Sequence, residues 1–433
     1  MKKTLLLIAT LLASYVGMAQ ETYHPTAENL KAREQFQDEK FGIFLHWGLY
    51  SMMGTTEWIM TNRDINYKEY PKLAKTFYPS EFDADAWVKA IKAAGAKYIT
   101  ITTRHHDGFS LFKTATSTYN SVDGTPFKRD IIKEMADACQ RNGIKLHLYY
   151  SHLDWGREDY PVGRTGSGTG RPKEKANWAS YYKFMNTQLT ELLTNYGEVG
   201  AIWFDGWWDH DSDAKPFDWQ LEEQYAMIHK LQPQCLVANN HHHTPFPGED
   251  IQIFERDLPG ENKAGLSGQS IGRLPLESCQ TINEHWGYNI TDTLYKSPKE
   301  LIQMLVRAAG KNANLLLNIG PEPGGALPEL ALDRLQSLGK WLNQYGETIY
   351  RTRGGIVTPH EWGVSTQRGN KLYIHILNCM DSSLFIPTGN HKIKSATVFG
   401  TNKRVNFTKT GNGITLNLDT VPTEIDYIVE LSL

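Results

Sequence analysis

Short β-rich apolar runs alternate with amphipathic stretches of helical period over residues 40–345, and this alternation restricts the fold more than any other feature. Such alternation is typical of repeated βα units around a parallel sheet. Eight runs are present, at 41–47, 97–105, 144–151, 199–206, 235–240, 251–255, 278–283 and 313–320. Helical patterns follow most of them, at 83–94, 129–141, 178–195, 219–231, 298–309 and 328–345. Because eight parallel strands close into a barrel, we expect an α/β fold of the (β/α)8 TIM-like class.

The pattern changes after residue 350 to strict apolar–polar alternation. It is clearest at 371–378, 404–409, 413–418 and 426–433, with the turn sequence TGNG at 410–413. Alternation of period two with short turns predicts antiparallel strands. We therefore expect a catalytic barrel over 21–348 followed by a C-terminal antiparallel β-sandwich over 349–433, which carries no cluster of titratable residues.

The first 20 residues read as a cleaved secretory signal peptide. Two lysines precede an apolar run that ends near small residues, which is the usual order of such signals. This predicts export to a periplasm or to the outside of the cell. No later stretch reaches the roughly 20 apolar residues needed to span a bilayer, so we expect no membrane span in the mature chain.

Overall charge argues against a nucleic-acid partner. The chain has 433 residues with 45 Lys and Arg against 48 Asp and Glu, a formal net charge of −3. A chain-wide basic field is thereby excluded. The four cysteines lie far apart and form no short-spaced zinc or redox motif, and we expect no cofactor.

Polar residues close most of the predicted strands. In a βα barrel the reacting groups lie at the carboxyl ends of strands, so these positions are the candidates for a site. They are His46, His105, His106, Tyr149, Tyr150, Asp205, the segment 239–243 and Glu255.

Asp205 and Glu255 form the strongest pair among them. In AIWFDGWW at 201–208, two-residue alternation turns Trp203 and Asp205 to one side, toward the barrel axis. Two carboxyl groups about 5–5.5 Å apart, one ionised and one protonated, are what retaining glycoside hydrolysis requires. Glu277 is the main rival to Glu255, but it begins its run and is expected nearer the opposite end of the barrel. A helix N-cap or an arginine partner remains the structural alternative for Asp205.

The histidines leave a metal site open as an alternative. HHH at 241–243 and HHD at 105–107 hold the commonest metal ligand. Adjacent residues on a strand face opposite ways, and no HExxH motif is present. Hydrogen bonding of neutral histidines to sugar hydroxyls explains the same residues equally well.

Six motifs in order resemble the α-L-fucosidases of glycoside hydrolase family 29. They are FGIFLHWGLYS at 41–51, EW at 57–58, TTRHHDGF at 102–109, LYYSHLDW at 148–155, IWFDG at 202–206 and NLLLNIGPEPGG at 314–325. The resemblance covers nearly all of the chain after the first 20 residues. It implies a (β/α)8-like barrel with a C-terminal β-sandwich, retaining chemistry, no metal cofactor and a fucosylated oligosaccharide or glycoconjugate as substrate.

The resemblance also assigns roles to residues. It implies Asp205 as the nucleophile, with Glu255 in the interval expected for the acid/base and Glu277 matching a different family glutamate. The implied fucose pocket comprises His46, Glu57, Trp58, His105, His106, Tyr149 and Trp203, with Trp286 as a wall for the sugar methyl group.

One stretch departs from the family pattern. Many relatives carry Asn-Asp-Arg where this chain reads Asn239-Asn240-His241, so a sugar-binding arginine is not expected there. With FERDLPG at 254–260, this departure favours the branch that prefers α-1,3/4-linked fucose. The sequence therefore predicts a retaining exo-α-L-fucosidase. A retaining glycosidase of other sugar specificity and a non-catalytic glycan-binding protein with stacking tryptophans are the alternatives.

Overall fold

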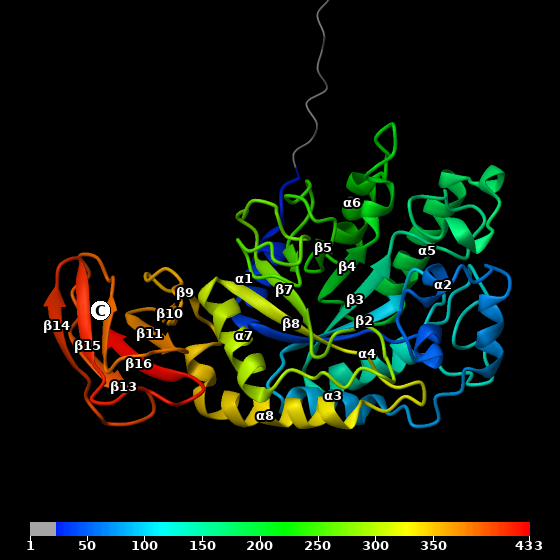
Figure 1. The fold of residues 1–433 in the computed structure, drawn as a ribbon. Helices are drawn as coiled ribbons and strands as arrows, with labels where there is room; N and C mark the ends of the chain where they lie inside the picture. Colours follow the sequence, from blue (N-terminus) through cyan, green and yellow to red (C-terminus); the bar gives the residue numbers. More distant parts are fainter. Residues whose placement is uncertain (1–22) are drawn as a thin grey trace, which may run out of the picture.

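The computed structural model describes residues 23–433 and divides into a barrel and a smaller β-rich unit beside it (Figure 1). The predicted signal peptide over 1–20 lies outside the described residues. The barrel unit ends with helix α8, and the first strand of the second unit begins at Arg353.

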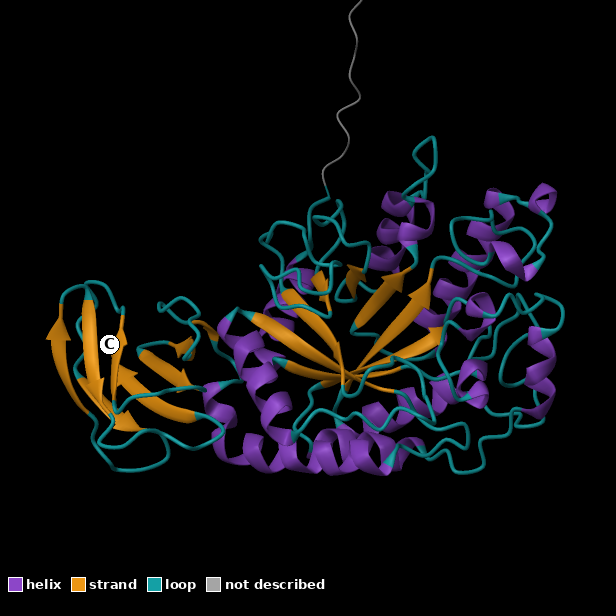
Figure 2. Cartoon of the chain, viewed as in Figure 1, coloured by secondary structure: helices purple, strands orange, loops and turns teal. Residues whose placement is uncertain are grey.

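Eight parallel strands form the barrel sheet, in the order β5-β4-β3-β2-β1-β8-β7-β6. One parallel bridge between Ala238 and Ile251 joins the two outer strands, β5 and β6, and closes the ring. The (β/α)8 TIM-like prediction is confirmed (Figure 2). The strands are β1 (Phe41–Leu45), β2 (Tyr98–Arg104), β3 (Lys145–Ser151), β4 (Ala201–Asp205), β5 (Leu236–Asn239), β6 (Gln252–Glu255), β7 (Leu276–Thr281) and β8 (Ala313–Ile319).

Helices cover the outside of this sheet. Side chains of Asp83, Asp130, Asn177 and Ser297 accept hydrogen bonds from the first turns of α3, α4, α5 and α7, the usual way to satisfy free amides at a helix start. The links from β5 to β6 and from β6 to β7 contain loops instead of helices. The helices are α1 (Ala27–Glu39), α2 (Ile59–Asn62), α3 (Ala84–Ala93), α4 (Ile131–Asn142), α5 (Trp178–Asn195), α6 (Leu221–Leu231), α7 (Pro298–Gly310) and α8 (Glu329–Tyr345).

Helix α1 was not anticipated by the pattern along the chain. Its sequence is mostly polar, and only Asn29 and Phe36 are buried, so it has no apolar stripe from which a helix could be predicted. Phe36 packs with Tyr98 in the cluster that fills the barrel. The Asn314 side chain donates to the Phe36 carbonyl, which fixes the helix against the N-terminal end of the barrel.

The side chains of β4 alternate between the inside and the outside of the barrel, as predicted. Ala201 and Trp203 lie in the cluster inside the barrel, while Ile202 and Phe204 belong to the larger core between sheet and helices. Asp205 continues the inward series and ends the strand. The carboxylate of Asp205 therefore lies at the C-terminal mouth of the barrel.

Two antiparallel sheets build the C-terminal unit, which confirms the predicted β-sandwich. Their inner faces share one core that includes Ile374, Ile386 and Leu416. One sheet has the order β13-β16-β11-β10-β9 and the other β12-β15-β14. The strands are β9 (Arg353–Gly354), β10 (Gly363–Arg368), β11 (Lys371–Ile376), β12 (Ser383–Ile386), β13 (Ser395–Val398), β14 (Asn406–Thr410), β15 (Gly413–Asn417) and β16 (Tyr427–Ser432).

The sandwich is tied to the barrel through helix α7. The Gln303 side-chain amide donates to the carbonyls of Leu377 and Ile425. Within residues 23–433, every helix is too short or too polar to cross a membrane.

Candidate active site

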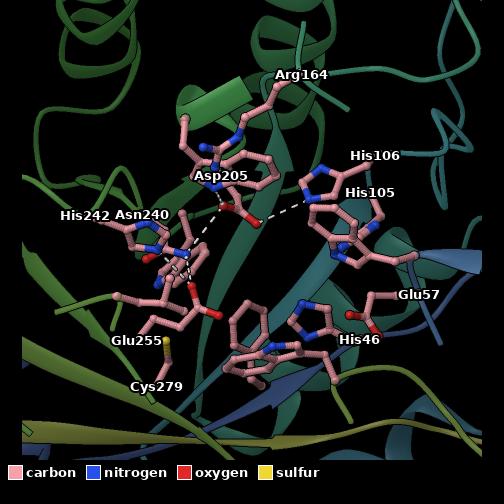
Figure 3. A pocket seen from close by; sticks show the side chains of 16 residues that line it. His46, Glu57, His105, His106, Arg164, Asp205, Asn240, His242, Glu255 and Cys279 are labelled. Carbon is pink, nitrogen blue, oxygen red and sulfur yellow. Dashed lines mark hydrogen bonds and ion pairs between the residues drawn. The ribbon is translucent and has the colours of Figure 1, made fainter. Parts of the chain in front are cut away.

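A cavity of about 190 Å³ opens at the C-terminal mouth of the barrel (Figure 3). This is below the roughly 300–1,000 Å³ typical of sites for drug-sized ligands, and it suits one monosaccharide. Its lining comprises Phe44, His46, Glu57, Trp58, His105, His106, Arg164, Trp203, Asp205, Trp208, Asn240, His242, Glu255, Leu266, Cys279 and Trp286.

Asp205 is held by donors on both carboxylate oxygens. Oδ1 accepts from the Gly206 amide at 2.8 Å and from the Trp208 indole at 3.1 Å. Oδ2 accepts from the Tyr149 hydroxyl at 3.1 Å, and His106 Nε2 lies 3.5 Å from the same oxygen. None of these partners is an arginine, and the carboxylate faces the cavity.

Glu255 closes β6 on the other side of the cavity. Its Oε2 lies 2.9 Å from His242 Nε2 and accepts from Asn240 Nδ2 at 2.8 Å. The same Asn240 nitrogen lies 3.4 Å from Asp205 Oδ1. One amide nitrogen therefore holds both carboxylates close together across the cavity.

The order of proton affinity in the two acids is opposite to the sequence prediction, in which Glu255 is protonated and Asp205 is ionised. Burial, followed by the negative charge of Glu255, raises the pKa of Asp205 to about 6. Burial also raises the pKa of Glu255, but the hydrogen bond and charge of His242, together with the Asn240 hydrogen bond and the charge of Arg256, outweigh burial and lower that pKa overall. In the unliganded site Asp205 therefore has the higher pKa of the two acids. The prediction missed this because sequence motifs do not show the His242 contact.

Three neutral histidines line the cavity. Burial lowers the pKa of His46 to about 4 and lowers those of His105 and His106 well below the usual range. Asn318 donates to a carbonyl through Nδ2, so its Oδ1 accepts from His46 Nδ1 at 2.6 Å. Ser151 likewise donates onward and accepts from His106 Nδ1 at 2.7 Å. Nε2 of His46 and His106 is thus left as an acceptor for a sugar hydroxyl.

His105 and His106 both line the cavity, although adjacent residues of a strand would face opposite ways. The reason is that β2 ends at Arg104, so the alternation stops before these residues. Their rings lie 4.1 Å apart between centroids. Nδ1 of His105 has no hydrogen-bond partner in the part of the chain that the structure describes.

Aromatic rings form the walls of the cavity. Trp58 stacks on Trp208 with centroids 5.5 Å apart. Trp286 packs 5.3 Å from His46 and lies near Phe44. Glu57 accepts from the Gly287 amide at 2.9 Å, which ties the Trp58 segment to the Trp286 segment. Apolar ring faces beside a few fixed polar groups are the usual composition of a sugar-binding cavity.

Nine of the ten predicted site residues line the cavity, and Tyr149 does not. Tyr149 is fully buried below it, where it stacks between the lining residues His105 and Trp203 and donates a hydrogen bond to Asp205. Glu277 is also absent from the lining. It lies in the second position of β7, deeper in the barrel, where Tyr98 and Trp203 donate to it.

Arg164, Leu266 and Cys279 line the cavity but were not proposed from the sequence as site residues, whereas Asn240 and His242 belong to the candidate segment 239–243. Arg164 comes from the long loop after β3 and Leu266 from the loop after β6. Asn240 and His242 follow β5 directly, a position that itself indicates the mouth of a barrel. Cys279 projects from β7 as a buried thiol. The position of Arg164 could not be predicted from the periodicity of the sequence, because the folded loop brings it over Trp208.

The described residues contain no group of three or more His, Cys, Asp or Glu side chains arranged to hold a metal ion. The histidines after β5 engage carboxylates one at a time: His241 with Glu249, and His242 with Glu255. Trp207 is not among the residues that line the cavity, and it packs against His243 and Phe246.

Comparison with known proteins gives a consistent result. The profile of the family described as "Alpha-L-fucosidase" matches residues 10–347. The plasma α-L-fucosidase of Rattus norvegicus is 31% identical over 406 residues, covering 85% of this chain and 82% of that protein. The human plasma enzyme is 30% identical over 391 residues, covering 81% and 78%.

Solved structures agree with the sequence matches. α-L-Fucosidase isoenzyme 1 from Paenibacillus thiaminolyticus has a TM-score of 0.82 at 34% identity, covering 94% of this chain and 99% of that one. A GH29 α-L-fucosidase from Bacteroides thetaiotaomicron, trapped as a covalent intermediate with 2-fluoro-fucosyl fluoride, has a TM-score of 0.80 at 27% identity, covering 95% and 97%.

Proposed function

The chain belongs to the α-L-fucosidase family, glycoside hydrolase family 29, and from that membership we propose that it releases terminal L-fucose with Asp205 as nucleophile and Glu255 as acid/base. The observation that carries this assignment is the amide nitrogen of Asn240, which lies within 3.4 Å of one oxygen of each carboxylate. A short separation of the two acids, about 5–5.5 Å, characterises retaining glycosidases.

The reaction proceeds in two displacements. Asp205 bonds to the anomeric carbon while the bond from that carbon to the aglycone oxygen breaks, and this oxygen takes the proton of Glu255. Glu255 then takes a proton from water, the water oxygen bonds to the anomeric carbon, and Asp205 leaves as a carboxylate. Two inversions retain the α configuration. The reacting form has Asp205 ionised and Glu255 protonated, which is the minor singly protonated form of the unliganded site, because the pKa of Asp205 is raised to about 6 and that of Glu255 is lowered.

The size of the cavity supports exo action on fucosylated oligosaccharides or glycoconjugates. A volume of about 190 Å³ holds one sugar ring, so further residues must lie outside. Trp286 and Phe44 supply an apolar wall suited to the methyl group of a deoxy-sugar. A glycan-binding protein would not need two carboxylates in this cavity, because burying charge near like charge is costly.

We propose that the enzyme prefers α-1,3/4-linked fucose, with support from the FERDLPG stretch and from the two loops that bring Arg164 and Leu266 to the mouth. Both loops reach the cavity, so a branched sugar attached to bound fucose would contact them. Initial rates on α-1,2-, α-1,3-, α-1,4- and α-1,6-linked fucosides test this, and faster turnover of the α-1,2 or α-1,6 linkage contradicts it.

The experiment that tests the assignment uses 2-fluoro-fucosyl fluoride, which is expected to leave a stable ester on the nucleophile. Peptide mapping by mass spectrometry should place the label on Asp205. Proton NMR of early product should show α-L-fucose before mutarotation. A label on another residue removes Asp205 from its role, and β-fucose as first product removes double displacement.

We propose in addition that the protein is exported, on the evidence of residues 1–20. Expression of the full chain in a bacterial host, followed by cell fractionation and N-terminal sequencing, tests this. A mature protein that begins near residue 21 outside the cytoplasm supports export, whereas an intact N-terminus on cytoplasmic protein contradicts it.

A further inference from the structure

His242 occupies a backbone conformation that an L-residue rarely adopts. Its φ is +66°, in the left-handed region, at the turn that follows β5. His243 donates from its amide to His241 Nδ1 at 3.0 Å, and His241 Nε2 in turn binds Glu249. The neighbours on both sides therefore hold the turn in place. Non-glycine residues in this conformation carry a cost and often mark functional positions.

This conformation directs the imidazole of His242 into the cavity against Glu255 (Figure 3). Both partners of the glutamate, His242 Nε2 and Asn240 Nδ2, contact the same oxygen, Oε2. The other oxygen, Oε1, has no hydrogen-bond partner among residues 23–433. The two oxygens of the acid/base are therefore not equivalent.

We propose that His242 is a positioning residue for the acid/base: it fixes Oε2 of Glu255, so that Oε1 is the atom that gives the proton to the glycosidic oxygen and takes one from water. This inference rests on the proposed role of Glu255. His242 donates from Nε2–H to the carboxylate, and this hydrogen bond strengthens as Glu255 loses its proton, because charge-assisted hydrogen bonds are stronger than neutral ones.

Electrostatics around Glu255 agree with this role. The His242 contact opposes the effect of burial and, together with Asn240 and Arg256, lowers the pKa of Glu255, so the protonated carboxyl group is a stronger acid toward the leaving group. The polar and charged groups around His242 and Glu255 are Asp205 on β4, Arg256 after β6, Cys279 on β7, His46 after β1, Arg164 in the loop after β3, and His241 and His243 on the same turn.

Removal of the imidazole should weaken the acid and leave the fold intact. Glycine accepts a φ of +66° without strain, so His242→Gly removes the contact without disturbing the turn. We expect kcat/KM for a fucoside with a poor leaving group to fall about tenfold or more, since general acid catalysis contributes about 10²–10⁴-fold. Dinitrophenyl fucoside needs no proton on its leaving group and should lose less than about threefold.

The pH profile separates this role from a structural one. Because Glu255 has the lower pKa of the two acids, its titration sets the acid limb of kcat/KM on a substrate that needs both of them, and in His242→Gly this limb should move to higher pH by at least about half a unit. Added imidazole should move the limb back. His243→Ala is the matched control, because His243 packs on Trp207 and Phe246 and makes no contact with Glu255.

Glu255→Gln in the same assays separates failure of this inference from failure of the proposed function. Suppose that Glu255→Gln loses activity selectively on the fucoside with the poor leaving group. The role of His242 is then overturned if the limb of the kcat/KM profile does not move in His242→Gly, or if His242→Gly loses activity equally on both substrates. If Glu255→Gln itself keeps full activity on that substrate, the acid/base assignment fails first.

Discussion

The indole of Trp203 donates a hydrogen bond to Glu277 Oε1 at 2.9 Å, inside the barrel and below the sugar cavity. The Tyr98 hydroxyl occupies the other oxygen of the same carboxyl group at 2.6 Å. Glu277 is only 1% exposed, and burial raises its pKa to about 7. Because Trp203 lines the cavity, Glu277 acts on the site by fixing one of its walls.

Glu277→Ala should therefore weaken substrate binding without removing the acid/base. The indole N–H and the Tyr98 hydroxyl would lose their partner, at a cost of about 1–3 kcal/mol for each unsatisfied buried group. We expect a lower melting temperature and a KM about tenfold higher on aryl fucosides, while azide restores nothing. Glu277→Gln keeps one acceptor, so its melting temperature and its KM should lie between those of wild type and Glu277→Ala. Recovery of Glu277→Ala by azide would move the acid/base role to Glu277.

Asp205→Ala should lower kcat on an aryl fucoside at least about a thousandfold, because the attacking group is lost. The matched control is Asp137→Asn, a half-exposed acid of α4 paired with Lys133 at the surface. Steady-state rates measure both variants. Activity of Asp205→Ala within tenfold of wild type would mean that another residue attacks the sugar.

Glu255→Ala should keep its activity best on substrates with good leaving groups, where protonation is dispensable in the first step. The second step is then slow because no base deprotonates the water, whereas azide is an anion and attacks without a base. Added azide should restore turnover and give α-L-fucosyl azide, identified by NMR, since attack occurs on the glycosyl-enzyme. β-L-Fucosyl azide would instead indicate that the nucleophile had been removed.

The barrel and the position of Asp205 follow from simple periodicities. Two-residue alternation in AIWFD places Trp203 and Asp205 on the inner face, and the structure agrees. The same rule misjudges His105 and His106, because it holds only while the strand lasts and β2 ends at Arg104. Strand patterns thus predict which face a residue takes within a strand but not how the chain turns after it.

Contacts made by loops could not be predicted from the sequence. Arg164 reaches the cavity from the loop after β3, where neither period nor motif marks it. The pairing of His242 with Glu255 depends on a left-handed turn, and histidine is not a residue from which such a turn is predicted. This contact, with Asn240, Arg256 and the burial of Asp205, reverses the expected order of proton affinity in the two acids, so electrostatics was the least predictable property of the site.

The activity of the enzyme should fall in acid as Asp205 takes up a proton. With its pKa raised to about 6 by burial and then by the charge of Glu255, the acid limb of kcat/KM should lie near that pH for a substrate that needs no proton from Glu255. Glu255→Gln removes the second cause, so the limb should move to lower pH. Dinitrophenyl fucoside is the substrate for this comparison, because it does not need the acid. An unchanged limb in Glu255→Gln would show that the two carboxylates do not interact.

The raised pKa of Asp205 also predicts how stability depends on pH. The folded state binds this proton more tightly than the unfolded state, whose Asp pKa is about 3.9, so an ionised Asp205 reduces stability above about pH 6, and this loss is relieved as pH falls toward 4. Asp205→Asn removes the charge, and the Tyr149 hydroxyl can turn to accept from the new amide. Its melting temperature should exceed that of wild type at pH 7.5 and approach it at pH 4. Thermal unfolding at both values measures the effect, with Asp137→Asn as the surface control. A gain of equal size at both pH values would assign it to packing instead of charge.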